Sequence, residues 1–255
     1  MPATFAVALG LGAALMPVGT GATGGSTAPA PDNGLVGYWR FDGSPADASG
    51  HRNAGTVINA SFGRGRVGKA LDLTGSDDSH VTVRASPSLG RMDRRITVAA
   101  WVFPRTLPNG FRVVASRQIA ALMHPDQFYL GFGTQHGTVR YKWHVGTTEG
   151  GKTREASIYA GAPEPGHWVH LAGVYDGRTI TLYIDGRAIG HQPTKGRIPV
   201  DDNPVTIGAE ENGPVPFVVE NELDGRIDEV RLYDRALSAR EIRALYKGTR
   251  GGADS

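Results

Sequence analysis

Asp228 is the residue of this sequence whose position most needs a chemical explanation. It alternates with Val230 and Leu232 in a segment expected to form a strand, so a regular strand would point its carboxylate toward an apolar layer. An unpaired carboxylate in such a layer is destabilising, so it requires a cation or hydrogen-bond donors. If no ion binds, the expected partner is an arginine such as Arg226 or Arg231.

Another group of possible metal ligands lies near the start of the chain. Asp42, Asp47 and Asn53 are close in sequence, and segment 47–55 is short, contains glycine and is rich in oxygen-bearing side chains. Calcium binds about six to eight oxygens from carboxylates, amides and backbone carbonyls. This loop could therefore wrap a calcium ion between the first and last strands. The alternative is that Asp47 and Asn53 only form hydrogen bonds within their own turn.

A third candidate is a string of acidic residues that could serve a glycosidase. These acids are Glu220, Glu222, Asp224, Asp228 and Glu229. Glycosidases place two carboxyl groups on either side of the scissile bond, roughly 5–10 Å apart. The alternative, which we favour, is that these acids belong to an edge loop and a turn.

Aromatic residues near expected loops could form a platform for a sugar. Aromatic faces bind sugar rings while polar groups around the edge bind their hydroxyls. The candidate rings are Trp143, His144, Phe217 and Tyr141, and the candidate edge residues are Asn109, His124, Asp126, Glu210 and Asn212. The alternative for Trp143 and Tyr141 is ordinary packing of strand residues.

His167 and His170 resemble a metal-binding pair until strand geometry is considered. Residues three apart lie on opposite faces of a strand, so these two imidazoles are not expected to bind one ion together. The sequence also contains no Gly-x-Ser-x-Gly motif and no nucleotide-binding loop. We therefore assign no catalytic residue from the sequence.

The composition predicts one β-rich domain. The chain has 255 residues, 40% of them hydrophobic, and its 36 glycines and 16 prolines are typical of many turns between short strands. The formal net charge is only +2, which argues against nucleic acid or an anionic membrane as partner. Because there is no cysteine, disulfides and thiolate metal sites are excluded.

The two ends of the chain do not look like parts of that domain. The first residues are apolar and small, and Thr20-Gly21-Ala22 offers a small-x-small cleavage site, so residues 1–22 are expected to be a secretory signal peptide. The apolar run is too short to span a membrane. Residues 23–33 are interpreted as a flexible linker, 34–248 as the domain and 249–255 as a disordered tail.

Alternating hydrophobic runs predict about a dozen strands and one helix. The expected strands are 35–41, 56–62, 70–73, 81–84, 96–103, 112–117, 128–132, 139–145, 168–175, 180–184, 205–207 and 227–233. Ser238 and Glu241 form a capping box, Leu237 and Ile242 a hydrophobic staple, and Gly248 marks the helix end. The longest polar loops are expected at 105–110, 146–154, 160–166 and 210–222. Such a set favours two packed antiparallel sheets.

Seven motifs in order resemble one known family. They are Tyr38-Trp39-Arg40-Phe41-Asp42-Gly43; Asp47-x-Ser49-Gly50-x-x-Asn53-x-Gly55; Gly65-x-x-Gly68-Lys69-Ala70-Leu71-Asp72-Leu73; Ile96-Thr97-Val98-Ala99-Ala100-Trp101-Val102; Trp168 to Gly177; Leu182-Tyr183-Ile184-Asp185-Gly186; and the terminal block from Leu223 to Tyr246. Their order and spacing are similar to the LamG-like jelly-roll family of the concanavalin A-like lectin/glucanase superfamily. The resemblance covers residues 34–248.

The resemblance implies an all-β jelly-roll sandwich of two antiparallel sheets with a short C-terminal helix, and frequently one structural calcium ion. The residues that match the family's calcium pattern are Asp42, Asp47, Asn53 and Asp228, with Gly50 and His51 as possible carbonyl donors. The β-glucanases of the superfamily carry Glu-x-Asp-x-x-Glu on a strand. Glu222 and Asp224 match its first two acids, but Ile227 occupies the position of the third, which counts against that activity.

These observations lead to three hypotheses about function. The first is a secreted, non-catalytic, monomeric module that binds an extracellular glycan or a component of the cell surface or matrix. The second is a polysaccharide hydrolase or lyase on the same fold, which would need ionisable groups converging on one sheet face. The third is an adhesion module that binds protein through an apolar patch on the rim.

Overall fold

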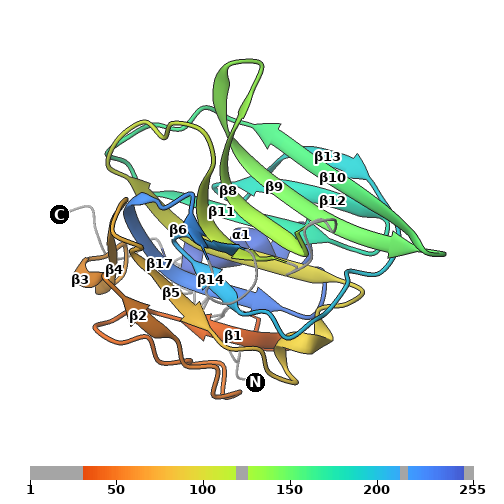
Figure 1. The fold of residues 1–255 in the computed structure, drawn as a ribbon, viewed down its shortest axis with the longest axis horizontal. Helices are drawn as coiled ribbons and strands as arrows, with labels where there is room; N and C mark the ends of the chain where they lie inside the picture. Colours follow the sequence, from red (N-terminus) through yellow and green to blue (C-terminus); the bar gives the residue numbers. More distant parts are fainter. Residues whose placement is uncertain (1–30, 119–125, 213–217, 250–255) are drawn as a thin grey trace, which may run out of the picture.

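The protein is a sandwich of two large antiparallel β-sheets with one helix on the outside (Figure 1). This computed structural model describes residues 31–118, 126–212 and 218–249. Residues 1–22, expected to be a signal peptide, lie outside this part, as do most of the expected linker and of the C-terminal tail. Among the described residues, no helix is long and apolar enough to cross a membrane.

The first sheet has eight strands in the order β13-β12-β11-β6-β17-β4-β3, and β1 also pairs with β17. Its strands are β1 (Leu35–Trp39), β3 (Ser61–Arg64), β4 (Lys69–Thr74), β6 (Ile96–Pro104), β11 (Val169–Tyr175), β12 (Thr179–Ile184), β13 (Arg187–Pro193) and β17 (Asp224–Tyr233). A 3-10 turn, η1 (Leu89–Arg91), precedes β6.

The second sheet has seven strands in the order β10-β9-β8-β7-β14-β5-β2. Its strands are β2 (Thr56–Ile58), β5 (His80–Val83), β7 (Arg112–Arg117), β8 (Phe128–Gln135), β9 (Thr138–Glu149), β10 (Lys152–Ala160) and β14 (Val205–Ile207). A separate hairpin is formed by β15 (Glu210–Asn212) and β16 (Val218–Glu220). The predicted fold class, two antiparallel sheets and a C-terminal helix, is confirmed.

One hydrophobic core fills the space between the sheets. Alternate residues of each strand supply it, as the period of two requires. Trp39, Trp143 and Phe132 are among its largest fully buried side chains. Trp143 also donates from its indole N–H to the Val174 carbonyl, 3.2 Å away, which satisfies its polar atom inside the core.

The short helix α1 (Ala239–Gly248) begins with the capping box that the sequence predicts. Ser238 Oγ accepts from the Glu241 backbone N–H at 3.3 Å, and the Glu241 carboxylate accepts from the Ser238 N–H at 2.7 Å. Ile242 and Leu245 are buried together with Leu237 in a second apolar cluster on the outer face of the eight-stranded sheet. The helix therefore covers part of that face, and it ends at Gly248, as the sequence predicts.

Strand β17 contains a bulge that changes where Asp228 points. The register with β6 shifts between Asp228 and Arg231, and Glu229 has a positive φ of 55°. Ile227, Val230 and Leu232 are in the core, so the side chain of Asp228 lies on the other side of the sheet. We expected Asp228 to lie on the same side of the sheet as Val230 and Leu232. That expectation is wrong, because it assumed a regular strand without a bulge.

Several expected boundaries also differ from the structure. The predicted strand 56–62 is two strands, β2 and β3, separated at Asn59, which has a positive φ of 45°. The predicted loop 146–154 is the tip of the β9–β10 hairpin, and β10 and β13 were not predicted at all. In both missed strands the alternation of hydrophobic and polar residues is weak, because many of their residues are polar and exposed.

Candidate functional site

A row of polar side chains crosses the outer face of the seven-stranded sheet, which we call the polar face. Aligned neighbours in this row come from all seven strands: Ser157, His144, Tyr129, Ser116, Thr206, Thr82 and Thr56. Their strand neighbours, such as Trp143 and Leu130, belong to the core. Because side chains alternate between faces, the polar row and the core are two sides of the same strands.

Lys142 lies on this face with its ammonium group among aromatic rings. Its Nζ is 4.5 Å from the ring centre of Phe111, 4.4 Å from that of Tyr129 and 5.9 Å from that of Tyr159. Gly133 makes room for this arrangement, since a Cβ there would lie 2.8 Å from the Tyr159 ring. The rings stabilise the cation through their π faces, although burial lowers the pKa of Lys142.

Two carboxyl groups, those of Asp126 and Glu210, interact electrostatically with Lys142. Asp126 lies just before β8, and its backbone carbonyl accepts from the Gly146 N–H of β9 at 3.0 Å. Glu210 begins β15, and its Oε2 accepts from the Asn221 amide at 2.7 Å. Burial and then the charge of Glu210 raise the pKa of Asp126 to about 6, and burial also raises the pKa of Glu210.

His144 is neutral on this face. Its Nδ1 lies 2.8 Å from Ser157 Oγ, and the side chain is buried. Burial, followed by the nearby Lys142 charge, lowers the pKa of His144 to about 3. The imidazole can therefore donate one hydrogen bond and accept another, like an amide, across the physiological pH range.

At the far end of the polar face, a buried ion pair attaches the β15–β16 hairpin to the sheet. His80 Nε2 lies 2.9 Å from Glu211 Oε1, and Thr82 Oγ1 also donates to this carboxylate. Burial alone would lower the pKa of His80, but the hydrogen bond with Glu211 raises it overall. Glu210 and Glu211 thus fulfil different roles, because Glu211 secures the hairpin while Glu210 joins the charged group around Lys142.

The structure brings together three of the residues predicted to bind a ligand and separates others. Asp126, His144 and Glu210 all interact electrostatically with Lys142 on the polar face. Trp143 is fully buried in the core, as the alternative of ordinary packing predicted. Asn109 is exposed in the loop before β7, beside Thr106, Arg112 and Asp224. His124, Phe217 and the side chain of Asn212 lie outside the described residues.

The sequence interpretation missed Lys142 and the rings around it. The signal was present in the alternation of 141–145, which places Lys142 and His144 on one face and Tyr141 and Trp143 on the other. Grouping Tyr141, Trp143 and His144 as one platform ignored that alternation. Tyr129 and Tyr159 come from other strands and Phe111 from the loop just before β7, so no local pattern connects them with Lys142.

Asp47, the centre of the expected calcium loop, has all its acceptor sites occupied by protein donors. Oδ1 accepts from the Tyr38 and Ser49 N–H groups at 2.9 and 2.8 Å, and Oδ2 accepts from Ser49 Oγ and the Asn53 N–H at 2.8 and 2.9 Å. A carboxylate offers about four lone-pair sites. The amide of Asn53 donates to the Val36 carbonyl and to Ser88 Oγ.

The other expected calcium ligands point to different partners. Asp42 Oδ1 accepts from the Lys69 N–H at 3.0 Å, and His51 is exposed with Nε2 3.5 Å from Arg91. Gly50 has a φ of 88° and no atom near the position of a Cβ. Asp228 Oδ2 accepts from the Val67 N–H at 2.9 Å, and it is not paired with Arg226 or Arg231.

One atom among the expected ligands would accept a cation, since Asp228 Oδ1 is buried without a hydrogen-bond partner. Burial raises the pKa of this carboxyl group to about 7. In the described part of the chain, however, no three His, Cys, Asp or Glu side chains are grouped as metal ligands. The contacts of Asp47 and Asn53 therefore do not fit a calcium ion held by this set, and calcium binding stays a prediction from the resemblance.

The acidic string between residues 220 and 229 does not form one site. Asp224 pairs with Arg105 at 2.8 Å, and Glu229 pairs with Arg231 at 2.6 Å and accepts from Tyr38 Oη at 2.7 Å. Ile227 is buried in the core. His167 is exposed while His170 is buried beside Trp101, so these two histidines do not share a site either.

Comparison with solved structures shows the same fold in several other proteins. Domain 4 of AbnA, a GH43 extracellular arabinanase from Geobacillus stearothermophilus in complex with arabinotriose, has a TM-score of 0.62 at 18% identity over 83% of this chain and 98% of its own. The binding domain of Paraclostridial Mosquitocidal Protein 1 has a TM-score of 0.62 at 19% identity, over 85% of this chain and 52% of its own.

The sialidase of Trypanosoma rangeli has a TM-score of 0.64 at 18% identity, over 93% of this chain. This chain spans 36% of the sialidase, about half of the mosquitocidal binding domain and nearly all of the arabinanase domain. A family model described as the concanavalin A-like lectin/glucanases superfamily, Laminin_G_3, matches residues 74–243. The chain therefore belongs to this family of the concanavalin A-like lectin/glucanases superfamily.

Proposed function

We propose that this protein is a secreted, non-catalytic module that binds extracellular carbohydrate on the polar face. The observation that carries the proposal is the convergence of Asp126, Lys142, His144 and Glu210 with three aromatic rings on one sheet face. These groups come from β8, β9, β10 and β15 and from the segments just before β7 and β8, so only the folded chain assembles them.

The chemistry of this face matches that of a sugar. Carboxylates accept hydrogen bonds from sugar hydroxyls, while Lys142 and the neutral His144 can donate to them. Phe111 is 38% exposed, which leaves part of its ring free for stacking. The arabinanase domain, which was solved with arabinotriose, supports a carbohydrate among the possible ligands.

The direct test is a calorimetric titration guided by a glycan array, with variants of the polar face. Lys142→Met keeps much of the side-chain volume but removes the charge, so we expect affinity to fall about 10-fold or more. Phe111→Ala should weaken binding about 2- to 10-fold through lost stacking. The control is Val200→Ala, which truncates a side chain that is 41% exposed outside the strands.

Equal affinity of Lys142→Met, Phe111→Ala and wild type for every glycan that binds would contradict the polar face as the binding site. An array on which no glycan binds, with well-folded protein, would contradict the carbohydrate proposal as a whole. Circular dichroism melting curves of the variants separate lost binding from lost folding.

A polysaccharide hydrolase or lyase is the second candidate, and the raised pKa of Asp126 favours it. Acid–base catalysis uses a carboxyl group with a pKa of about 6 near a second carboxyl group whose pKa is also raised, and Asp126 and Glu210 form such a combination. The two candidates differ in product formation. Release of oligosaccharides by wild type that is lost in both Asp126→Asn and Glu210→Gln would establish the enzyme.

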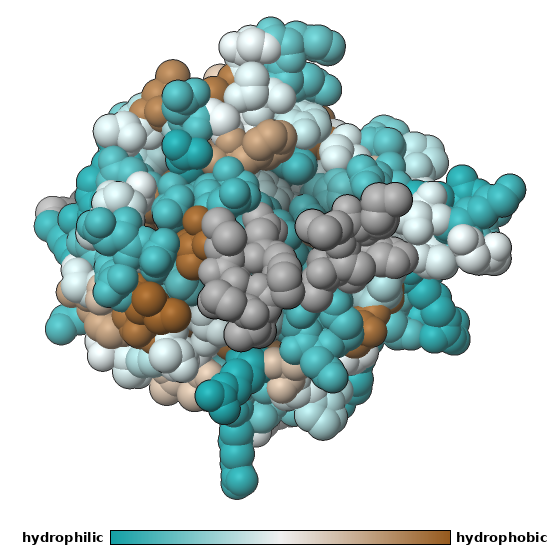
Figure 2. Space-filling model, in the orientation of Figure 1, coloured by the Kyte–Doolittle hydropathy of each residue, from teal (hydrophilic) through white to brown (hydrophobic). Residues whose placement is uncertain are grey.

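The remaining parts of the proposal concern export and protein partners. If residues 1–22 are a signal peptide, N-terminal sequencing of exported protein should begin after residue 22. The face presented in Figure 2 is mostly hydrophilic, with hydrophobic residues only in small groups. The described residues on this side show no large apolar patch for an adhesion module, so binding of protein is not the function that we propose.

A further inference from the structure

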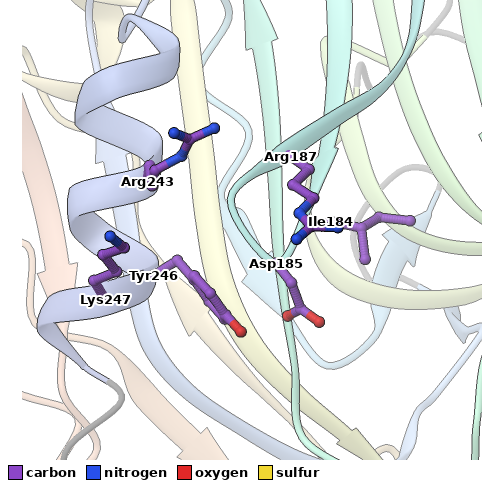
Figure 3. A pocket seen from close by; sticks show the side chains of 6 residues that line it. All are labelled: Ile184, Asp185, Arg187, Arg243, Tyr246 and Lys247. Carbon is purple, nitrogen blue, oxygen red and sulfur yellow. The ribbon is translucent and has the colours of Figure 1, made fainter.

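A cleft of about 670 Å³ lies between α1 and the turn that connects β12 with β13. Figure 3 shows Arg243, Tyr246 and Lys247 extending from the helix, opposite Ile184, Asp185 and Arg187 of the turn. The Tyr246 side chain reaches across toward Asp185. We call this space the helix cleft. Its residues belong to β12, β13, the turn between them and α1, none of which contributes to the polar face.

The helix cleft has an excess of positive charge. Arg187, Arg243 and Lys247 are exposed, and none of them forms an ion pair within the described residues. Among the described residues, Asp185 is the only acid that lines the cleft, and its Oδ1 already accepts from the His170 N–H at 3.0 Å. Three exposed cations that no carboxylate neutralises, gathered around one cleft, favour an anion as the ligand.

The walls of the helix cleft are held in place by packing. Tyr246 stacks on Trp101 with ring centres 5.6 Å apart, and Trp101 donates from its indole N–H to Thr249 Oγ1 at 2.6 Å. Gly186 has a φ of 74°, and a Cβ there would lie 3.3 Å from Arg243 Cα and from Tyr246 Cβ. The turn therefore touches the helix directly, and the cations project from a preorganised frame.

A second, smaller pocket adjoins the helix cleft. Its volume is about 330 Å³, and it shares Ile184 and Asp185 with the cleft. Half-buried Trp168 and exposed His167 and Glu164 contribute to its lining. An aromatic ring with hydrogen-bonding groups at its edge is the surface that a sugar ring prefers. The neighbouring cations and aromatic pocket therefore suit one ligand that carries both an anionic group and sugar rings.

We propose that the helix cleft and the adjoining Trp168 pocket form a second binding site, which takes an acidic oligosaccharide. Its carboxylate or sulfate group binds Arg187, Arg243 and Lys247, and the next sugar ring lies against Trp168. This site is separate from the polar face and does not depend on the function proposed there. A guanidinium binds a carboxylate or sulfate through two parallel hydrogen bonds, which gives Arg187 and Arg243 the larger share of the recognition.

The test is a calorimetric titration of the full chain with three probes: an oligogalacturonate, a sulfated oligosaccharide and a neutral oligosaccharide of the same length. A fourth titration uses inorganic sulfate alone. Arg187→Gln and Arg243→Gln should each weaken binding of an acidic oligosaccharide about 10-fold or more, and added salt should weaken wild-type binding. The matched control is Arg240→Gln, an exposed arginine of α1 that does not line the cleft.

Trp168→Ala distinguishes an oligosaccharide from a simple anion. It should weaken binding of the acidic oligosaccharide about 3-fold or more but leave binding of inorganic sulfate unchanged, because only a sugar ring contacts the indole. Val200→Ala, at an exposed residue that lines neither pocket, should leave this binding unchanged. Because Arg187→Gln and Arg243→Gln change only the helix cleft, whereas Phe111→Ala changes only the polar face, failure of one site and failure of the other are separate results. The variants are first compared by their melting curves.

Three outcomes would overturn the proposal. The first is an affinity for both acidic oligosaccharides that is unchanged in Arg187→Gln and Arg243→Gln. The second is equal binding of acidic and neutral oligosaccharides. The third is binding of inorganic sulfate as tightly as the oligosaccharide, which would show an anion site without sugar recognition.

Discussion

Individual side chains of the polar face differ from their counterparts in water because the fold buries them beside each other. Burial favours the neutral form of an acid or a base, so it raises the pKa of Asp126 and lowers the pKa of His144 and of Lys142. The same effect leaves a carboxyl group and a neutral imidazole on one surface near pH 6. Such groups can exchange hydrogen bonds with a sugar without first losing an ion pair.

The raised pKa of Asp126 makes the stability of the protein depend on pH. The folded pKa of about 6 lies above the unfolded value of 3.8, so the stabilisation from the protonated form is complete below pH 3.8 and is lost as pH rises through about 6. Asp126→Asn removes this loss. We expect the variant to melt a few degrees higher than wild type at pH 7.5, with no such gain at pH 3.5, below the unfolded pKa.

Calorimetry at these two pH values measures the difference. Glu210→Gln is the comparison. Because the pKa of Glu210 is also raised, this variant should likewise gain stability over wild type at the higher pH. A stability gain for Asp126→Asn that is the same at both pH values would contradict a titration in this range.

Asp47 illustrates how one carboxylate can organise a loop with hydrogen bonds alone. Asp47→Asn replaces one acceptor oxygen by an NH2 group, which then faces N–H and O–H donors of the protein and cannot bond them. We therefore expect a loss of about 2 kcal/mol in the free energy of unfolding. Urea unfolding measures this loss. Asp42→Asn is the control, since Asp42 is 36% exposed and should change stability less. A loss for Asp47→Asn seen only in the presence of calcium would indicate an ion ligand instead.

At the scale of elements, short-range interactions decide where each strand and the helix begin and end. The Asp176-Gly177 turn between β11 and β12 and the capping box of α1 form as their sequences predict, because both depend on hydrogen bonds between near neighbours. The bulge of β17 is different. It depends on pairing with β6 on a remote part of the chain, and it reverses the side of the sheet on which Asp228 lies.

The capping box should contribute measurably to stability because α1 covers an apolar cluster. Ser238→Ala removes the acceptor of the Glu241 N–H, so we expect a loss of about 1 kcal/mol in the free energy of unfolding. Thermal or urea unfolding measures this effect. Arg240→Ala, on the exposed side of the same helix, should stay within about 0.5 kcal/mol of wild type. A Ser238→Ala variant as stable as wild type would show that packing alone positions the helix.

At the scale of the molecule, the two sheets expose faces of different character. The polar face carries buried ionisable groups that compensate one another, whereas the outer face of the eight-stranded sheet is partly covered by α1 and bordered by the unpaired cations of the helix cleft. Two unlike surfaces on one sandwich could bind two parts of a polymer, and avidity would then exceed either single affinity.

The melting temperature provides a test of calcium for the whole molecule. A ligand that binds only the folded state adds about 2.7 kcal/mol to the free energy of unfolding at a hundred times its Kd. Because protein donors occupy the acceptor sites of Asp47, we expect the melting temperature to be the same in millimolar calcium and in excess chelator. A rise of several degrees that depends on calcium concentration, and that Asp228→Ala abolishes, would establish the ion.

The sequence by itself determined the features that depend on near neighbours: the alternation of most strands, the turn dipeptides, the capped helix and the set of motifs that identified the family. Only the tertiary structure decided which side chains meet. Asp126, Lys142 and Glu210 are distant in sequence and become neighbours because β8, β9 and the β15–β16 hairpin are brought together. Arg187 and Arg243 meet because α1 docks on the β12–β13 turn. The physical reason is that local hydrogen bonds and sterics shape an element, whereas pairing and burial between remote elements choose its surroundings.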